Sequence, residues 1–258
     1  MNGKPFVILL GTSYDPQRIV ASAAKLCYSS SDISSLVEAQ TEEKTASFIE
    51  MLATIGHESP IEHASFTFGI ENVSRALLAQ ITRHRIASFS VQSQRYVKMK
   101  ELDYITPPRI SKNAEALKIY QQQMESVKET YDSLIDLLIE DEVTSILEQN
   151  PNMDEETARK KAEKNVQEDA RFILPNAAAT KMVVTMNARS LMNFFKHRCC
   201  NRAQWEIRDL ATQMLKLCRE AAPQIFKNAG PPCLNSSCPE GKMSCGKIKE
   251  VREEFNNI

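Results

Sequence analysis

The sequence predicts an α+β fold, in which a mixed, mainly antiparallel sheet is flanked by helices. Residues 64–71 and 180–186 alternate apolar and polar side chains, which is the pattern of half-buried strands. Residues 6–10 form a short apolar run, and we expect a buried strand there. With 258 residues, 42% of them hydrophobic, the chain can bury a sizeable core. We expect one α+β domain over residues 1–229 and a C-terminal extension over residues 230–258.

Helices are predicted after the first strand, where apolar residues recur at helical spacing. This spacing covers residues 16–28 and residues 42–55. A further helical turn is expected to begin at Pro60. An N-cap serine, a first-turn proline and a capping-box acid follow in order at Ser59, Pro60 and Glu62.

Beyond the strand at 64–71, Ser74 is placed to cap a helix that ends near Arg85. Gln80, Arg83 and His84 stand at positions i, i+3 and i+4, so they would share one face of this helix. Their side chains suit a polar ligand, because an amide, a guanidinium and an imidazole can each donate hydrogen bonds.

The C-terminal half is predicted to be mostly helical. Residues 113–149 form a long amphipathic stretch, which favours a packing or dimerising helix. Residues 154–169 are highly charged, and we expect a solvated helix there. Two more helices are expected over 188–199 and 203–226. The tail from Gly230 is rich in Pro, Gly, Ser and Cys, and it predicts a loop or an ordered extension.

A basic segment runs from Arg83 to Tyr96 and carries three arginines, one histidine, three serines and two glutamines, with no acidic residue. The whole chain has a net charge of −1, so the positive charge is local and indicates a small phosphorylated ligand rather than a nucleic-acid polymer. The part after Arg85 lacks helical periodicity and is expected to form a loop over this ligand. Ser93 and Arg95 would point the same way if that loop is extended. The alternative is a solvated basic helix end.

A second polar segment covers Asn187 to Arg198, with Asn187 as a helix cap. At about 100° per residue, it forms an apolar and a polar face. These faces contain, respectively, Leu191, Phe194 and Phe195, and Arg189, Asn193 and His197. Arg198 lies near the apolar side, where an always-charged group must either be paired or point into a pocket.

We predict no metal site. All four histidines lie in the motif segments, but their spacing matches no zinc signature. Cys233, Cys238 and Cys245 offer three thiols without an evident fourth ligand, and we expect ordinary reduced thiols. The neighbouring Cys199 and Cys200 are expected to fill core space on their helix.

The sequence carries neither a secretory signal pattern at its N-terminus nor an apolar run long enough to cross a membrane. Seven cysteines, an odd number, favour reduced thiols over a disulfide framework. We therefore expect a soluble, cytoplasmic protein that binds neither a membrane nor nucleic acid.

Several ordered motifs give the chain a family resemblance. Arg83-His84-Arg85 is followed after seven residues by Ser93. Four further segments support this signature, at residues 56–63, 171–175, 187–194 and 203–207. In this order and over residues 6–226, the chain resembles the flavin-dependent thymidylate synthases. It departs from many relatives at Val91, where they carry Glu, and at Gln94, where they carry Gly.

The resemblance implies an enzyme that makes dTMP from dUMP, with FAD as cofactor and methylenetetrahydrofolate and NADPH as co-substrates. It implies a homotetramer with shared active sites and no cysteine nucleophile. The residues implied to hold FAD are Ser59, Arg83, His84, Arg85, Ile86, Asn187, Ala188, Arg189 and Asn193. Those implied to hold dUMP are Gln80, Arg83, Ser93, Gln94, Arg95, Arg171 and Arg198.

Among these residues, Arg198 is the catalytic candidate, because a guanidinium near the uracil can stabilise negative charge on the pyrimidine. Ser93 and Arg95 can bind the nucleotide phosphate by charge-assisted hydrogen bonds. His57 is expected near the flavin or the folate.

Two other functions stay open at the level of the sequence. One is a non-catalytic nucleotide- or RNA-binding protein that uses the loop from Arg83 to Arg95. The other is a transferase with Ser93 as nucleophile and His84 as its base. Neither predicts a bound chromophore, whereas the flavoenzyme does.

Overall fold

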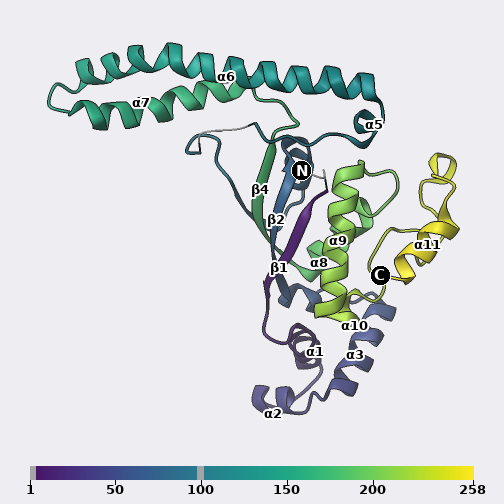
Figure 1. The fold of residues 1–258 in the computed structure, drawn as a ribbon. Coiled ribbons are helices and arrows are strands. Elements are labelled where there is room, and N and C mark those ends of the chain that lie inside the picture. The colour runs from purple at the N-terminus through teal and green to yellow at the C-terminus, as the bar shows by residue number, and fades with distance from the viewer. Residues whose placement is uncertain (1–3, 98–101) are drawn as a thin grey trace. The chain divides into compact units, whose positions relative to one another are not determined.

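The computed structural model describes residues 4–97 and 102–258 (Figure 1). Helices combine with a four-stranded antiparallel sheet, which confirms the predicted α+β fold. The strand order is β1-β2-β4-β3. The strands are β1 (Phe6–Thr12), β2 (Ser65–Ser74), β3 (Ala87–Val91) and β4 (Ala179–Asn187).

The chain forms two compact units. The larger unit contains Lys4–Glu71, Ala79–Ser90 and Met182–Ile258, and the smaller contains Asn72–Leu78 and Val91–Lys181. The tail from Gly230 therefore belongs to the larger unit. The domain boundary at residue 229 stays a prediction. In the part of the chain that the structure describes, no helix is long and apolar enough to cross a membrane.

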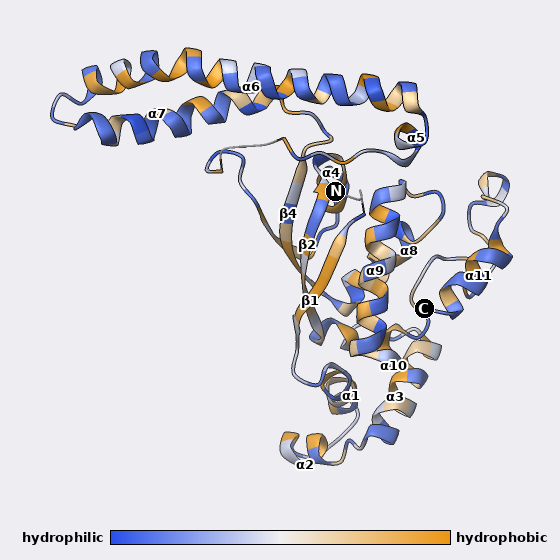
Figure 2. Cartoon of the chain, viewed as in Figure 1, coloured by the Kyte–Doolittle hydropathy of each residue, from blue (hydrophilic) through white to orange (hydrophobic). Residues whose placement is uncertain are grey.

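The first strand is found where the sequence predicts it, but the expectation that it is buried is wrong. β1 lies at an edge of the sheet and pairs antiparallel with β2, with Phe6 opposite Glu71. Phe6, Ile8 and Leu10 are 55%, 43% and 53% exposed, and Figure 2 shows β1 as a hydrophobic strand. The apolar run therefore reflects an open face of the sheet, not a strand enclosed on both sides.

The opposite face of the sheet is covered in the larger unit by helices. The helices of this unit include α1 (Pro16–Leu26), α2 (Ile33–Glu38), α3 (Glu42–Ile55), α8 (Ala188–Arg198), α9 (Trp205–Ala221), α10 (Pro223–Phe226) and α11 (Ile248–Asn256). The core contains a run of edge-to-face aromatic pairs, Phe66–Phe226, Phe226–Phe195 and Phe195–Phe194, with centroids 5.2–6.0 Å apart. These pairs fix α8 against the rest of the unit.

The helices over 16–28 and 42–55 are confirmed to within a turn at their ends. The sequence pattern over residues 203–226 predicted one helix, and the structure divides it at Ala222. Pro223 begins α10 because proline has no N–H to continue the preceding helix. The short helix α2 was not predicted.

The N-cap assigned to Ser59 is wrong. Residues Pro60–His63 form a 3-10 turn, η1, but the Ser59 side chain makes no capping hydrogen bond. Its backbone is itself helical, with φ −63° and ψ −39°, whereas an N-cap residue needs an extended backbone.

The helix capped by Ser74 is shorter than predicted. α4 covers Arg75–Ile81, and the Ser74 hydroxyl accepts the Leu77 N–H at 3.0 Å. The helix ends before Arg83. The prediction that Gln80, Arg83 and His84 share one helical face is therefore wrong. The loop expected after Arg85 is also wrong, since strand β3 begins at Ala87.

The smaller unit contains α5 (Pro108–Ser111), α6 (Ala114–Gln149) and α7 (Glu155–Ala170). Figure 1 shows α6 and α7 side by side and antiparallel. The packing helix predicted over 113–149 is confirmed. The expectation of a solvated α7 holds for one face only, because its small residues pack against α6 at Ala158, Ala162, Val166 and Ala170.

The tail is an ordered extension. It contains η3 (Gly241–Met243) and α11, which buries Val251 and Phe255. Arg252 fixes the tail internally, because its guanidinium donates to the backbone oxygens of Cys233 and Ser236, each at 2.9 Å.

Candidate functional site

A cavity of about 570 Å³ in the larger unit brings the two polar segments together. One wall is the chain between α4 and β3, and another is the polar face of α8. This volume is in the range of small-molecule sites. The lining residues are mostly hydrogen-bond donors: Glu62, Arg83, His84, Arg85, Ile86, Asn187, Arg189, Ser190, Asn193, His197 and Arg198.

Helix α8 positions its wall of the cavity through a cap and an apolar face. The Asn187 side chain accepts the Ser190 N–H at 2.8 Å, which confirms the predicted cap. Leu191, Phe194 and Phe195 are fully buried, as the periodicity predicts. The opposite face therefore turns Arg189, Asn193 and His197 toward the cavity.

Arg198 is both paired and directed at the cavity, so the two alternatives left by the sequence are both realised. Its Nε donates to His84 Nε2 at 3.0 Å. The His84 ring packs edge-to-face on Phe194, with centroids 4.9 Å apart. Burial, together with the charges of Arg198 and His197, lowers the pKa of His84 to about 4. His84 is therefore neutral at pH 7, with its proton on Nδ1.

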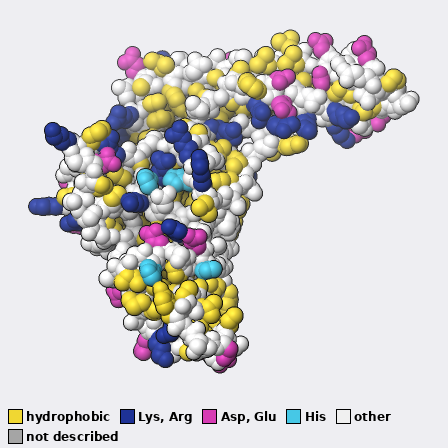
Figure 3. All heavy atoms as spheres, turned by 180° about the vertical axis from the view of Figure 1, so that it is seen from behind, with side chains coloured by type: hydrophobic (Ala, Val, Ile, Leu, Met, Phe, Trp, Pro, Cys, Tyr) yellow, Lys and Arg dark blue, Asp and Glu magenta, His cyan; other side chains and the backbone are white. Residues whose placement is uncertain are grey.

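Arg189 is held by two carboxylates. Its guanidinium pairs with Glu62, and its Nε lies 3.4 Å from the Glu58 carboxylate. These partners raise the pKa of Arg189, led by the hydrogen bond that its guanidinium donates to Glu62. The pairing fixes the guanidinium at the rim of the cavity. Figure 3 shows histidine side chains at the surface beside both basic and acidic side chains.

Most of the residues predicted to hold FAD line this cavity. Ser59 and Ala188 are not among its lining residues, and Ala188 is buried with its N–H donated to the Ala64 oxygen at 2.8 Å. Ile86 lines it with a φ of +57°, an unusual backbone for a β-branched residue. The site prediction missed Glu62, Ser190 and His197 as lining residues. The helical spacing of His197 from Asn193 was a usable signal, since both lie on the polar face of α8.

The residues predicted to hold dUMP are divided between the units. Arg83 and Arg198 line the cavity of the larger unit. Gln80 belongs to the same unit but is not among the residues that line this cavity. The other members lie in the smaller unit: Ser93, Gln94, Arg95 and Arg171.

Residues 94–96 form a turn, so the condition under which Ser93 and Arg95 would point the same way, an extended loop, is not met. The Ser93 hydroxyl accepts the Arg95 N–H at 3.2 Å. The Arg95 Nε lies 2.7 Å from a Glu168 carboxylate oxygen, an ion pair that the sequence did not predict. This hydroxyl and this guanidinium therefore both have partners inside the smaller unit.

A cavity of about 340 Å³ in the smaller unit contains Gln94 and Arg171, and it adds Arg75, which the sequence did not single out. Burial first, and then the charge of Arg171, lowers the pKa of Arg75. The lining includes no acidic residue. Two like charges without a carboxylate favour an anionic ligand such as phosphate. No local pattern marked Arg75, because its neighbour Arg171 is far away in sequence.

Other predicted groups lie away from these cavities. His57 lines none of the cavities described for the two units. Cys199 is fully buried, as expected for a core residue, and burial raises the pKa of its thiol. Within residues 4–97 and 102–258, no three His, Cys, Asp or Glu side chains group as metal ligands would.

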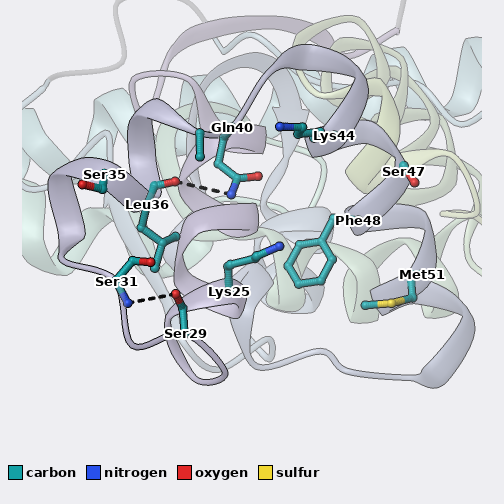
Figure 4. Close-up of a pocket in the computed structure, with 11 residues that line it drawn as sticks. Lys25, Ser29, Ser31, Ser35, Leu36, Gln40, Lys44, Ser47, Phe48 and Met51 are labelled. Carbon is teal, nitrogen blue, oxygen red and sulfur yellow. Dashed lines mark hydrogen bonds between the residues drawn. The ribbon is translucent and has the colours of Figure 1, made fainter.

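A separate cavity of about 370 Å³ lies among α1, α2 and α3 (Figure 4). The amino group of Lys25 lies over the ring of Phe48, 5.6 Å from its centroid. Gln40 donates to the Leu36 oxygen at 3.4 Å. None of the residues predicted for FAD or dUMP lines this cavity, so it is not part of the candidate site.

Comparisons with known proteins agree on one family. The family model described as thymidylate synthase complementing protein matches residues 8–224. The flavin-dependent thymidylate synthase of Clostridium tetani is 50% identical, over 99% of this chain and 100% of the relative. The enzyme of the same name from Geobacter sulfurreducens is 43% identical over 98% of each chain. That from Nitratidesulfovibrio vulgaris is 45% identical over 95% of each chain.

Proposed function

The chain belongs to the flavin-dependent thymidylate synthases, and we propose that it converts dUMP to dTMP with FAD as its cofactor. Methylenetetrahydrofolate is the carbon donor and NADPH the reductant. The observation that carries the site assignment is the meeting of the Arg83–Ile86 segment with the polar face of α8 in one cavity. Both segments belong to the motifs on which the family resemblance rests.

The residues of this cavity fit FAD. A flavin dinucleotide presents a diphosphate and many hydrogen-bonding groups, which suit guanidinium and amide donors. Arg83, Arg85 and Arg198 form no ion pair within the described residues, so their charge is available to an anion. Arg189 and Asn193 of α8, and Asn187 that caps this helix, add further donors. When bound, FAD supplies the redox chemistry.

We assign Arg198 to the pyrimidine of dUMP. Its Nε is used by His84, which leaves the two terminal amino groups of the guanidinium for a ligand. Since His84 is neutral, the charge of Arg198 is not cancelled by its partner. An uncancelled guanidinium in a partly buried site can stabilise the negative charge that develops on the pyrimidine.

We propose that the cavity of the smaller unit binds a phosphate group. Arg171 and Gln94 were expected there from the family resemblance, and Arg75 supplies a second guanidinium. A phosphate dianion would relieve the repulsion between the two arginines. Arg95 would reach the phosphate only by sharing or exchanging its Glu168 partner.

We further propose a homotetramer with shared active sites, acting in the cytoplasm. Phe6, Ile8 and Leu10 on β1 and Val183 on β4 expose apolar surface on the sheet of the larger unit, which supports self-association. All seven cysteines are free, which suits a reducing compartment. Light scattering on the purified enzyme checks the tetramer, and a monomer mass would contradict it.

The decisive experiment measures bound flavin and dTMP formation together. The purified protein is expected to show the visible absorption of oxidised flavin and to make dTMP when given dUMP and both co-substrates. Arg198→Ala is expected to keep its flavin and to lose at least about 100-fold in turnover, as for other oxyanion-stabilising groups. Arg109→Ala is the control, because Arg109 is exposed on α5 and lines none of the described cavities.

Two results would contradict the proposal. A colourless protein that forms no dTMP would remove the flavoenzyme and favour the nucleotide-binding alternative. Near-normal turnover of Arg198→Ala would remove the role of Arg198 alone. If Ser93→Ala keeps substantial activity, the serine-nucleophile alternative fails, since a nucleophile cannot be replaced by a methyl group.

A further inference from the structure

The cavity of about 570 Å³ that we assign to FAD is called the flavin cavity from here on. A second cavity of about 430 Å³, here called the annex, adjoins it in the larger unit. Arg189 and Asn193 of α8 line both cavities, so the two adjoin at this helix face. Met192 and Lys196 extend the same face of α8 into the annex, at helical spacing from Arg189. The opposite wall is the beginning of the C-terminal tail, residues 228–232.

Hydrogen bonds from Arg219 fasten this tail wall to the rest of the larger unit. The Arg219 guanidinium donates to four backbone oxygens, those of Phe226 at 3.3 Å, Ala229 at 2.9 Å, Phe255 at 2.6 Å and Ile258 at 2.8 Å. At the start of the tail, Gly230 has a φ of +148°, which other residues rarely adopt. A preformed wall of this kind lowers the entropy cost of binding a ligand against it.

The annex contains one lysine that has no ion-pair partner among the residues that the structure describes. Lys196 is exposed and forms no ion pair within the described residues. The acidic residue of its lining is Glu58, whose carboxylate lies near Arg189 at 3.4 Å. Pro231 and Pro232 add apolar surface beside this charge. The annex therefore suits an anionic group carried on a flat apolar body.

We propose that the annex receives the anionic end of a co-substrate, with Lys196 as its charged anchor. The identity of the co-substrates rests on the proposed function. Two of them carry such an end: methylenetetrahydrofolate has carboxylates beyond an aromatic amide, and NADPH has phosphates beside an adenine. A ligand seated in the annex can extend past Arg189 and Asn193 into the flavin cavity, because these residues line both.

The test measures binding to the oxidised, flavin-loaded enzyme by calorimetry, with tetrahydrofolate and NADP⁺ as separate probes. Lys196→Ala is expected to weaken one probe about fivefold, the upper range for an exposed charge pair, and Lys196→Arg to restore it. The probe whose binding is weakened by Lys196→Ala and restored by Lys196→Arg identifies the co-substrate that occupies the annex. Its binding to the wild type is also expected to weaken with added salt more steeply than its binding to Lys196→Ala.

Two further variants make the test specific. Asn235→Asp places a negative charge in the annex and also removes the hydrogen bond that Asn235 donates to the Asn228 oxygen at 2.9 Å. It is expected to weaken the same probe, and added salt should reduce the part of this effect that is due to charge. Lys216→Ala is the matched control, because Lys216 is an exposed lysine on α9 that lines none of the described cavities. It is expected to leave both probes unchanged.

The proposal is overturned if neither probe weakens in Lys196→Ala and Asn235→Asp. It is also overturned if Lys196→Ala loses its flavin, because the annex would then hold part of FAD. Failure of the proposed function has a different signature, since a wild-type protein without flavin or dTMP formation would refute the enzyme whatever Lys196 does.

Discussion

Replacing His84 tests the electrostatics of the candidate site through its effect on folding stability. In the folded chain the pKa of His84 is about 4, against 6.5 for the unperturbed side chain, because of burial and the nearby charges of Arg198 and His197. As the pH falls from 6.5 toward 4, the unfolded chain takes up a proton that the folded chain excludes. Stability is therefore complete above pH 6.5 and is lost as the pH falls through this window.

The magnitude follows from the two pKa values. Their difference corresponds to about 3 kcal/mol in total, of which about 2 kcal/mol is lost between about pH 7.5 and about pH 5. Because His84 is only partly buried, solvent screening reduces this to between about 1 and 2 kcal/mol. His84→Gln removes the titration and should make stability less dependent on pH by this amount.

The assay is urea unfolding of the wild type and the variant at both pH values and at one protein concentration, since association shifts apparent stability. His84→Gln also loses the ring contact with Phe194, but that loss is the same at both pH values. His63→Gln serves as the control, because His63 is exposed. Equal pH dependence in the wild type and His84→Gln would refute the lowered pKa of His84.

Three other predictions concern the tail, the thiols and the strained residue. Phe255→Ala should lower the free energy of unfolding by about 3 to 5 kcal/mol, whereas Phe172→Ala should change it by less than about 0.5 kcal/mol, because the two side chains are 2% and 82% exposed. Unfolding by urea measures both. In the native protein a thiol-specific reagent should modify the exposed Cys245 before Cys199, because burial raises the pKa of the Cys199 thiol. Mass spectrometry of the labelled peptides measures the order of labelling. Labelling of Cys199 before Cys245 would contradict this prediction. Ile86→Gly should stabilise the flavin-free protein by about 1 kcal/mol, since glycine accepts a φ of +57° without strain; a lower melting temperature would contradict the strain.

Local periodicity was sufficient to predict the secondary structure where a helix packs along one face. The helix at 42–55 and the cap at Asn187 follow from side chains within a few residues of each other. The polar face of α8 could be read for the same reason, and it gave a large part of the flavin cavity. The family motifs then connected this face with the Arg83 segment, which spacing alone could not do.

The errors occur where the structure depends on contacts that are distant in sequence. The exposed position of β1 depends on the strand order, which an apolar run does not encode. The loop expected after Arg85 is an exception, because apolar residues at 87, 89 and 91 alternate with two serines in β3, and this local strand signal was overlooked. Arg75 becomes a candidate ligand-binding residue only because Arg171, which is distant in sequence, lies in the same cavity.

A neutral histidine is a suitable partner for Arg198, because it accepts a hydrogen bond without adding a negative charge. An aspartate at position 84 would bind the guanidinium and cancel its charge, whereas neutral His84 accepts one hydrogen bond and leaves the charge intact. His84→Asp and His84→Asn have nearly the same shape and both lose the imidazole. The aspartate variant is therefore expected to make dTMP at least about tenfold more slowly than the asparagine variant, a difference of about 1.4 kcal/mol in transition-state stabilisation. Single-turnover rates on flavin-loaded samples measure it, and equal rates would show that the charge of Arg198 does not act in the reaction.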